Sequence, residues 1–282
     1  MTRILFVFAM ALAAPALAAP KKATPRKLVI IDPELAVTGE KTQGFIDAFV
    51  ARLETVAGWK PGSLSGKGFL SVEAAAEYLK TQRPAFALLA SHAFVVLRQK
   101  QKLLVLGHAG VWDPKKLAYR GLALVNSNVG ALPHQQPGMR LATDIKDMQW
   151  LNVLFDGLLK PETHFQFVPA KNENEAVAAV REKRADMALV WGEHLDRYKD
   201  DLRSEGGKLR VAFNSAPLPP LALVAMTKNT TVADTKTLAK AVAEVCKGKP
   251  NIDTCANLGF LSLVPGPEEL HPHLAYKYDN YK

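Results

Sequence analysis

Polar side chains that could bind a ligand follow directly after the short apolar runs of this sequence. They offer carboxylates, imidazoles, a hydroxyl, an amide and an indole, which can hydrogen-bond a polar solute or stack against it. Ligands of open α/β sheets bind beyond the carboxyl ends of the strands, so such side chains are expected to meet at one site. Ser215 joins the set because we expect the chain to cross between two halves near it. The other candidates are Asp32, Ser91, His92, His108, Asn126, Asp144, Trp191 and Glu193.

Several of these residues also have a purely structural interpretation. Asp32 precedes Pro33 and could shape a turn, and Asp144 could cap the helix that follows it. A lone histidine beside an apolar strand, such as His108, is often a hydrogen-bonded core residue, and Trp191 could be core packing. If the set does bind a ligand, its carboxylates suit a cationic, amine or hydroxylated solute as well as they suit an anion.

No spacing of residues in the sequence matches a catalytic or metal motif. The GxSxG, HExxH and P-loop patterns are all absent. Ser91 and His92 are adjacent, and adjacent side chains of an extended segment point apart, so they are not expected to form a catalytic dyad. His271 and His273 form an incomplete set of metal ligands. We therefore expect a binding protein without enzymatic activity, cofactor or metal.

The N-terminal residues show the three regions of a secretory signal peptide. Arg3 supplies a positive charge, an uncharged apolar run follows over residues 4–17, and residues 16–18 fit the small-x-small cleavage pattern. The run is too short for a transmembrane helix, which needs about 20 residues. We expect a signal peptide over residues 1–18, a disordered linker over residues 19–26, and a periplasmic mature protein.

The composition is that of a folded globular chain with a basic balance. Hydrophobic residues make up 48% and charged residues 22%, which argues against extended disorder. Loss of residues 1–18 removes one positive charge, from Arg3, and changes the formal net charge from +9 to +8. The lysines and arginines are scattered apart from a cluster over residues 21–27, and no nucleic-acid-binding motif is present. We expect a monomer that binds neither nucleic acid nor, after cleavage, a membrane.

The two cysteines of the chain, Cys246 and Cys255, lie close in sequence. Neighbouring cysteines in an oxidising compartment usually pair, and closing a loop of about 10 residues would add roughly 2–3 kcal/mol of stability. A redox or metal site is the alternative. The spacing is not CxxC and no histidine lies between the two cysteines, which favours a structural disulfide.

Strand-type and helix-type segments alternate along the chain, which indicates an α/β fold with mainly parallel sheets. Short apolar runs predict strands at residues 27–31, 86–90, 103–107, 122–125, 139–143, 164–168 and 187–191. Apolar residues at helical spacing predict helices over residues 41–57, from residue 71 onward, and over 148–158, 172–184 and 236–247. Further apolar runs lie at residues 208–213 and 221–226.

Two stretches of the sequence are alike at a fixed offset of 101 residues. Residues 75–89 and residues 176–190 each consist of an amphipathic helix, an arginine and a short apolar strand. The first strand of each half also ends in an aspartate, Asp32 or Asp144. We interpret this repetition as two similar α/β lobes, each a mainly parallel sheet flanked by helices.

The last third of the chain is too short for a third domain, so we expect it to return to the first lobe. Lobe 1 then comprises residues 27–116 and 216–282, and lobe 2 comprises residues 117–215. The chain would cross between the lobes twice, near residues 116–127 and 207–220. Two extended crossovers form a hinge, about which the lobes could close on a ligand.

In this layout the chain resembles the type 2 periplasmic solute-binding proteins of ABC importers, nearest the phosphate/phosphite/phosphonate-binding subgroup. The segments RPAFALLASH (83–92), RADMALVWG (184–192) and LRVAFNSAPLPPLALV (209–224) carry the resemblance, together with the export signal. The resemblance covers most of residues 27–265. It implies a small ligand in a cleft between the lobes and an ABC permease as partner.

The chain departs from this family at the loop that opens the first helix of lobe 2. The family's phosphonate binders resemble each other in a Ser/Thr-rich loop there, whose hydroxyls and helix N–H groups hold an oxyanion. Here the loop is Asp144-Ile145-Lys146-Asp147, and two carboxylates would repel a phosphonate. The sequence therefore leaves the ligand open. The alternative function is a sensory or envelope-complex module with the same fold and no transport role.

Overall fold

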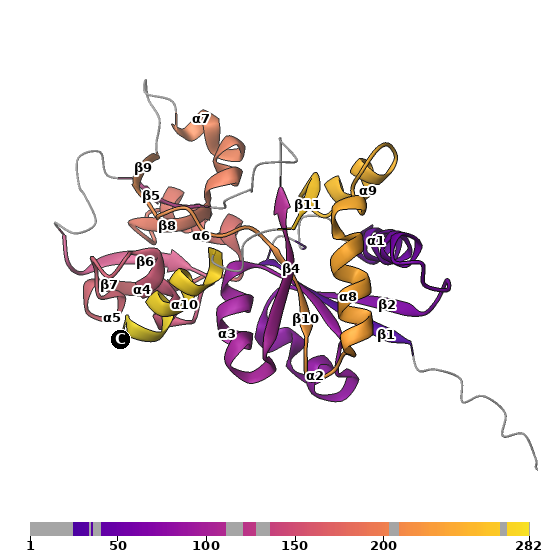
Figure 1. Ribbon diagram of the computed structural model, residues 1–282. Helices are drawn as coiled ribbons and strands as arrows, with labels where there is room; N and C mark the ends of the chain where they lie inside the picture. The colour runs from indigo at the N-terminus through magenta and orange to yellow at the C-terminus, as the bar shows by residue number, and fades with distance from the viewer. Residues whose placement is uncertain are drawn as a thin grey trace, which may run out of the picture.

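The computed structural model describes residues 25–33, 35, 41–110, 121–127, 136–202, 209–265 and 270–281. The expected signal peptide and most of the expected linker lie outside these ranges. The first strand begins at Arg26, the last residue of the predicted linker and one residue before the predicted start of the strand. Within the described ranges two separate sheets, each flanked by helices, form two lobes (Figure 1). No helix in these ranges is long and apolar enough to cross a membrane.

The sheet of lobe 1 has its strands in the order β11-β4-β10-β3-β1-β2. Strands β1, β2 and β3 pair in parallel, whereas β10 is antiparallel to both of its neighbours and β11 is antiparallel to β4. Four of these six strands therefore run in one direction. Their bounds are β1 (Arg26–Ile31), β2 (Leu64–Phe69), β3 (Phe86–Leu89), β4 (Leu103–Gly110), β10 (Ala222–Met226) and β11 (Ser262–Val264).

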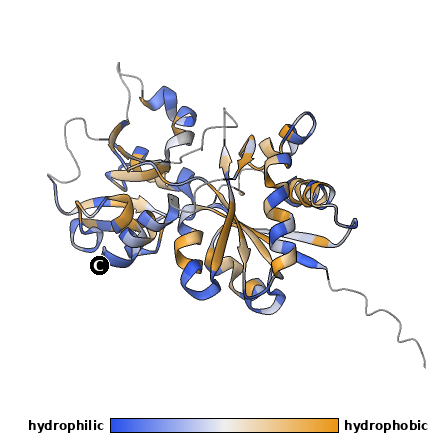
Figure 2. Ribbon diagram, viewed as in Figure 1, coloured by the Kyte–Doolittle hydropathy of each residue, from blue (hydrophilic) through white to orange (hydrophobic). Residues whose placement is uncertain are grey.

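Helices cover both faces of this sheet, because β1, β3 and β10 are apolar on both sides and need cover on each. On one face, α1 packs together with α8 and α9 through buried side chains such as Phe49 and Leu53. On the other face, α2 and α3 pack against the sheet through Leu79 and Phe94. Figure 2 shows these strands as apolar and the outer helix faces as polar. The helices are α1 (Thr42–Val56), α2 (Val72–Gln82), α3 (Ser91–Gln101), α8 (Val232–Ala241), η4 (Val242–Glu244) and α9 (Asn251–Ala256).

The sheet of lobe 2 has its strands in the order β7-β6-β8-β5-β9. Strands β6, β7 and β8 pair in parallel, and β5 is antiparallel to β8 and β9. The strands are β5 (Leu122–Asn126), β6 (Met139–Thr143), β7 (Phe165–Pro169), β8 (Met187–Trp191) and β9 (Arg210–Asn214). The helices of the lobe are α4 (Met148–Leu154), α5 (Pro161–His164), α6 (Glu173–Arg181), η3 (Gly192–Tyr198) and α7 (Lys199–Leu202).

The predicted repetition is present in the structure. The helix–strand unit α2–β3 in lobe 1 corresponds to α6–β8 in lobe 2, and the strand of each unit lies parallel to the first parallel strand of its lobe, β1 or β6. Both helices begin with a side-chain cap. The Ser71 hydroxyl accepts from the N–H of Ala74, and the Asn172 side chain accepts from the N–H of Glu175.

The chain returns from lobe 2 to lobe 1 between β9 and β10, so residues 215–221 form one connection, which overlaps the end of the crossover predicted near residues 207–220. The other predicted crossover, near residues 116–127, lies only partly within the described ranges, and its residues 122–126 form β5 of lobe 2. The C-terminal helix α10 (Leu270–Asn280), which we expected in lobe 1, contacts α3 of lobe 1 and α4 of lobe 2 (Figure 1). It is therefore shared between the lobes.

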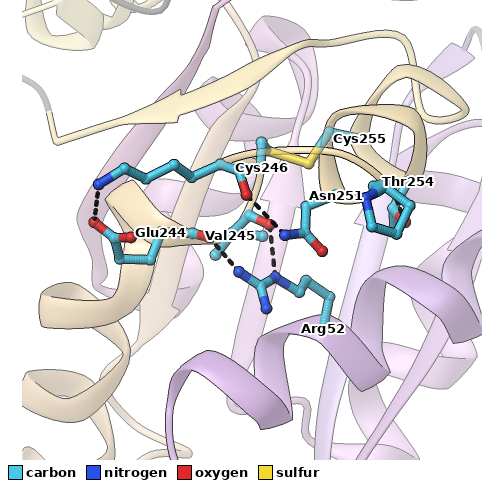
Figure 3. The surroundings of a disulfide bond; sticks show 9 residues. Arg52, Glu244, Val245, Cys246, Asn251, Thr254 and Cys255 are labelled. Carbon is cyan, nitrogen blue, oxygen red and sulfur yellow. Dashed lines mark hydrogen bonds and ion pairs between the residues drawn. A yellow bond between two sulfur atoms is a disulfide. The ribbon is translucent and has the colours of Figure 1, made fainter.

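The predicted disulfide joins Cys246, which follows η4, to Cys255 in α9, with an S–S distance of 2.09 Å (Figure 3). Both cysteines are buried. Next to the bridge, the Arg52 guanidinium of α1 donates to the carbonyl oxygens of Glu244 and Val245, at 2.7 and 3.0 Å. These bonds satisfy carbonyl groups that the end of the helical segment leaves open.

Candidate interlobe binding site

Asp32 and His108 lie at the same edge of the lobe 1 sheet. Ile31 is level with Leu89, and Leu89 and His108 both face Ala222 across β10. Both candidates are fully buried. The Asp32 carbonyl accepts from the N–H of Leu35, as the turn interpretation predicted. The His108 ring stacks on that of His271 from α10, with centroids 5.1 Å apart and planes inclined by 10°.

Ser91 and His92 open helix α3 instead of continuing an extended segment, which corrects our expectation from the sequence. Successive side chains of a helix point about 100° apart, so the two still diverge and form no dyad. The buried Ser91 hydroxyl donates to the carbonyl of Pro219 at 2.6 Å, which ties α3 to the crossover between the lobes. His92 points toward lobe 2.

The imidazole of His92 contacts two residues of helix α4 in lobe 2. Its Nε2 lies 2.8 Å from Oδ2 of Asp147, and its ring stacks on Trp150 with a centroid separation of 5.1 Å. Asp147, the last residue of the loop that departs from the family pattern, is the N-cap of α4 and accepts from the N–H of Trp150 at 3.0 Å. The cap is therefore Asp147, not Asp144.

Asp147 accepts a third hydrogen bond, of 2.7 Å, from the Tyr278 hydroxyl of α10. Burial alone would raise the pKa of Asp147, but the hydrogen bonds from His92, Tyr278 and the N–H of Trp150 outweigh it and lower the pKa to about 2. The same contact and the burial of the phenol raise the pKa of Tyr278 above its usual value. Because the carboxylate is ionised at neutral pH, Nε2 of His92 must donate to it.

Asp144 directly follows β6 and Trp191 ends β8, and these two strands are parallel neighbours in lobe 2. Partial burial and the nearby Glu173 carboxylate raise the pKa of Asp144, although its own backbone N–H opposes the shift. The N–H of Trp191 donates to Glu173 at 2.9 Å. The two residues are therefore brought together around Glu173. The side chain of Glu193, also a candidate, lies outside the described part of the structure.

Glu173, in the first turn of α6, is a site residue that the sequence did not reveal. Its carboxylate contacts Nδ1 of His194 at 3.0 Å and accepts from the Tyr198 hydroxyl at 2.8 Å. Burial would raise its pKa, but these bonds and the N–H of Trp191 lower it. A glutamate next to an N-cap is so common that it gives no signal of such a network.

Asn126 does not join the other candidates. It ends β5, and β5 is antiparallel to β8, so Asn126 lies opposite Met187 whereas Trp191 lies opposite Leu122. It is therefore at the far edge of the sheet, about 13 Å along the strand from Trp191 at 3.3 Å per residue. Ser215, in contrast, follows Asn214 at the same edge as Trp191, and its hydroxyl donates to the carbonyl of Ala216 at 2.9 Å.

The structure thus places two sets of polar groups near the strand ends of the two lobes, and the sets meet where His92 contacts Asp147. They are Asp32, Ser91, His92 and His108 in lobe 1, and Asp144, Asp147, Glu173 and Trp191 in lobe 2. Among the described residues no group of three or more His, Cys, Asp and Glu side chains is placed to hold a metal ion. Two α/β lobes with hydrogen-bonding groups at their junction are the architecture of a two-lobed solute-binding protein.

The model of the family described as "ABC transporter, phosphonate, periplasmic substrate-binding protein" matches residues 48–265. Since this match spans most of the sequence, the chain belongs to that family of substrate-binding proteins. The function of the chain is therefore to bind a solute, and as a member of this family of substrate-binding proteins it is not an enzyme. A sequence comparison with curated proteins gave no match.

Solved structures of the same fold cover nearly the whole chain. A Xanthomonas citri protein bound to ATP has a TM-score of 0.69 and 13% identity, over 92% of this chain and 98% of that one. A binding protein of an ABC phosphonate transporter from Pseudomonas aeruginosa has a TM-score of 0.66 and 11% identity, over 90% and 86%. PhnD1 from Prochlorococcus marinus, in complex with methylphosphonate, has a TM-score of 0.62 and 11% identity, over 90% and 97%. At these identities the likeness establishes the fold.

Proposed function

We propose that the mature protein is a periplasmic monomer that captures one small polar solute between its lobes and delivers it to an ABC permease. The observation that carries this proposal is the direct meeting of the lobes through polar groups, with His92 of lobe 1 lying 2.8 Å from Asp147 of lobe 2. A guest at this junction would contact both lobes at once, which is how binding couples to closure about a hinge. The signal-type N-terminus supports the periplasmic location.

The ligand class has to be established by experiment, because two indications point in different directions. The similar proteins from Prochlorococcus marinus and Xanthomonas citri are bound to methylphosphonate and ATP, which both carry phosphorus oxyanions. In this chain the loop before α4 carries Asp144 and Asp147, and Asp147 is ionised with a pKa of about 2. A carboxylate repels an oxyanion and attracts an amine or a hydroxyl donor.

The proposal is tested by thermal unfolding of the mature protein against methylphosphonate, phosphate, ATP, sugars, amines and divalent metals, followed by calorimetric titration of any hit. A ligand at 100 times its Kd is expected to stabilise the fold by about 2.7 kcal/mol. Asp144→Ala should change the affinity for that ligand, whereas the control Glu182→Gln, at an exposed residue of lobe 2, should not.

Native mass spectrometry of the protein from its own cells would identify a ligand outside the panel, and it would also report the oligomeric state. A chain that carries no small molecule there and gains no stability from any member of the panel would overturn the proposal.

A further inference from the structure

Asp147 joins three parts of the molecule through one carboxylate. It lies at the start of α4 in lobe 2, and it receives His92 from α3 of lobe 1 and the Tyr278 hydroxyl from the shared helix α10. Its other oxygen accepts from the N–H of Trp150 within its own helix. The carboxylate therefore binds donors from different parts of the molecule, and the distances between these donors change when the two lobes move relative to each other.

Glu173 offers an internal comparison, because it binds the same three kinds of donor. These are the imidazole of His194, the hydroxyl of Tyr198 and the backbone N–H of Trp191. All three come from β8 and η3, so the whole cluster belongs to lobe 2. The chemistry of the two carboxylates is alike, but only the contacts of Asp147 cross between the lobes.

Helix α10 is attached to both lobes around the same place. On the side of lobe 1, Asp279 accepts from Gln99 at 2.8 Å and forms an ion pair with Arg98. On the side of lobe 2, Asp156 accepts from the Tyr281 hydroxyl at 3.2 Å and forms an ion pair with Lys277. Movement of one lobe against the other must therefore strain or break contacts of α10, and the contact of Tyr278 with Asp147 lies between these attachments.

We propose that Asp147 is an internal latch, which holds the two lobes together through His92 and Tyr278. The lobes then separate only when this carboxylate releases its partners from lobe 1 and α10. The inference rests on the proposed function in one respect, namely that solute exchange needs the lobes to open. A charge-assisted cluster suits a latch, because such bonds are strong yet are lost together when one partner moves.

The test measures the separation of the lobes by pulsed electron paramagnetic resonance without any added solute. Spin labels are attached to the full mature chain at Lys80→Cys on α2 and Glu162→Cys on α5, both at exposed positions in different lobes. The native cysteines are paired with each other and do not react with the labels. Asp147→Ser removes the reach to His92 and Tyr278, but it keeps an oxygen that caps α4, since serine is a good N-cap.

Asp147→Ser is expected to add a longer-distance population that the labelled chain without this substitution lacks, and Tyr278→Phe is expected to add a smaller one. The matched control Glu173→Gln should leave the distance distribution unchanged. If Asp147→Ser gives the same distribution as the control, the latch is refuted. Should circular dichroism show Asp147→Ser to be unfolded, His92→Phe, which keeps a ring beside Trp150 but has no donor, and Tyr278→Phe decide the question, and unchanged distributions in both would refute it.

This readout is independent of the solute panel. A latch found in a chain that binds none of the solutes would leave the latch standing and count against the proposed function. If the chain binds a solute but the distances between the spin labels are unchanged in all three variants, the proposed function stands and the latch is refuted.

Discussion

The carboxylate of Glu173 accepts a 2.8 Å hydrogen bond from the hydroxyl of Tyr198. With His194 and the N–H of Trp191, this gives lobe 2 a carboxylate that is saturated by donors of its own lobe. Asp147 has an equivalent set of donors, but two of them come from outside lobe 2. One arrangement stabilises a lobe and the other joins the lobes, so substitutions at the two positions should have different consequences.

Glu173→Gln is expected to lower the free energy of unfolding by roughly 2–4 kcal/mol, because charge-assisted hydrogen bonds to a mostly buried carboxylate are lost and an NH2 group then faces a donor. Urea unfolding followed by circular dichroism measures the change. Glu182→Gln is the matched control, since Glu182 is exposed and its ion pair with Arg184 should contribute less than about 0.5 kcal/mol. Equal losses in the two variants would show that the Glu173 cluster adds nothing.

The stacked pair of His108 and His271 should make the fold sensitive to mild acid. Burial and the neighbouring His108 lower the pKa of His271 from 6.5 to about 3. Between these two values the unfolded chain binds a proton at this residue and the native chain does not. The free energy of unfolding should therefore be fully retained above pH 6.5, and it should fall as the pH drops below 6.5, by up to about 1.4 kcal/mol per unit.

The measurement is a series of urea unfolding curves between about pH 7.5 and pH 5, above the range where carboxylates such as Asp147 begin to titrate. His271→Phe replaces one ring by another beside Phe94, whose centroid lies 4.2 Å from that of His271. This variant should show a flatter dependence on pH. The assignment to His271 fails if the variant keeps the slope of the unsubstituted chain.

Most of the parallel core could be predicted from the sequence. Strands β3 and β8 are buried on both faces, and their sequences are therefore continuous apolar runs. Each run follows a short turn that begins with an arginine, Arg83 or Arg184. The predictions of where helices end were less accurate. The helix predicted over residues 148–158 ends at Leu154, because Asp156 and Gly157 take positive φ values of 53° and 69°, which stop α4.

Helices α3 and α10 were missed because their local sequence argues weakly for a helix. Val95 and Val96 look like strand residues, and α3 is helical because its apolar side packs against the sheet and α10. Helix α10 carries Pro272 in its first turn, where a proline is tolerated.

The candidate site could be predicted only in part, for two physical reasons. A strand's direction is not written in its apolar pattern, so Asn126 was placed at the carboxyl edge although β5 runs the other way. The contacts of Asp147 join residues that are 55 and 131 positions away in sequence, so no local spacing records them. Asp32 and Ser91 lie at one edge of the lobe 1 sheet because they follow the parallel strands β1 and β3.

Removal of the disulfide between Cys246 and Cys255 should lower the free energy of unfolding by roughly 2–3 kcal/mol, and the Tm by roughly 5–10 °C. The bridge closes a short loop, and the unfolded chain gains the freedom of that loop when the bridge is absent. Thermal unfolding of the Cys246→Ser/Cys255→Ser double variant gives the value. Addition of a reductant to the unsubstituted chain should reproduce most of the shift, and it should leave the double variant unchanged; a reductant effect of equal size in both would point to another cause.

A pair of glycine substitutions should separate a tight backbone contact from an open one. A Cβ on Gly192, next to Trp191 at the candidate site, would lie 2.8 Å from the carbonyl oxygen of Gly121, which already accepts the Gly192 N–H. Backbone cannot move aside as a flexible side chain can, so Gly192→Ala should cost roughly 1–3 kcal/mol. Gly44 in α1 has no atom within 4 Å of its added Cβ, and Gly44→Ala should stabilise the fold by about 0.5–1 kcal/mol, because alanine is the better helix former. Urea unfolding of both variants gives the two signs, and a stabilising Gly192→Ala would mean that the start of β5 does not lie as close to η3 as this structure places it.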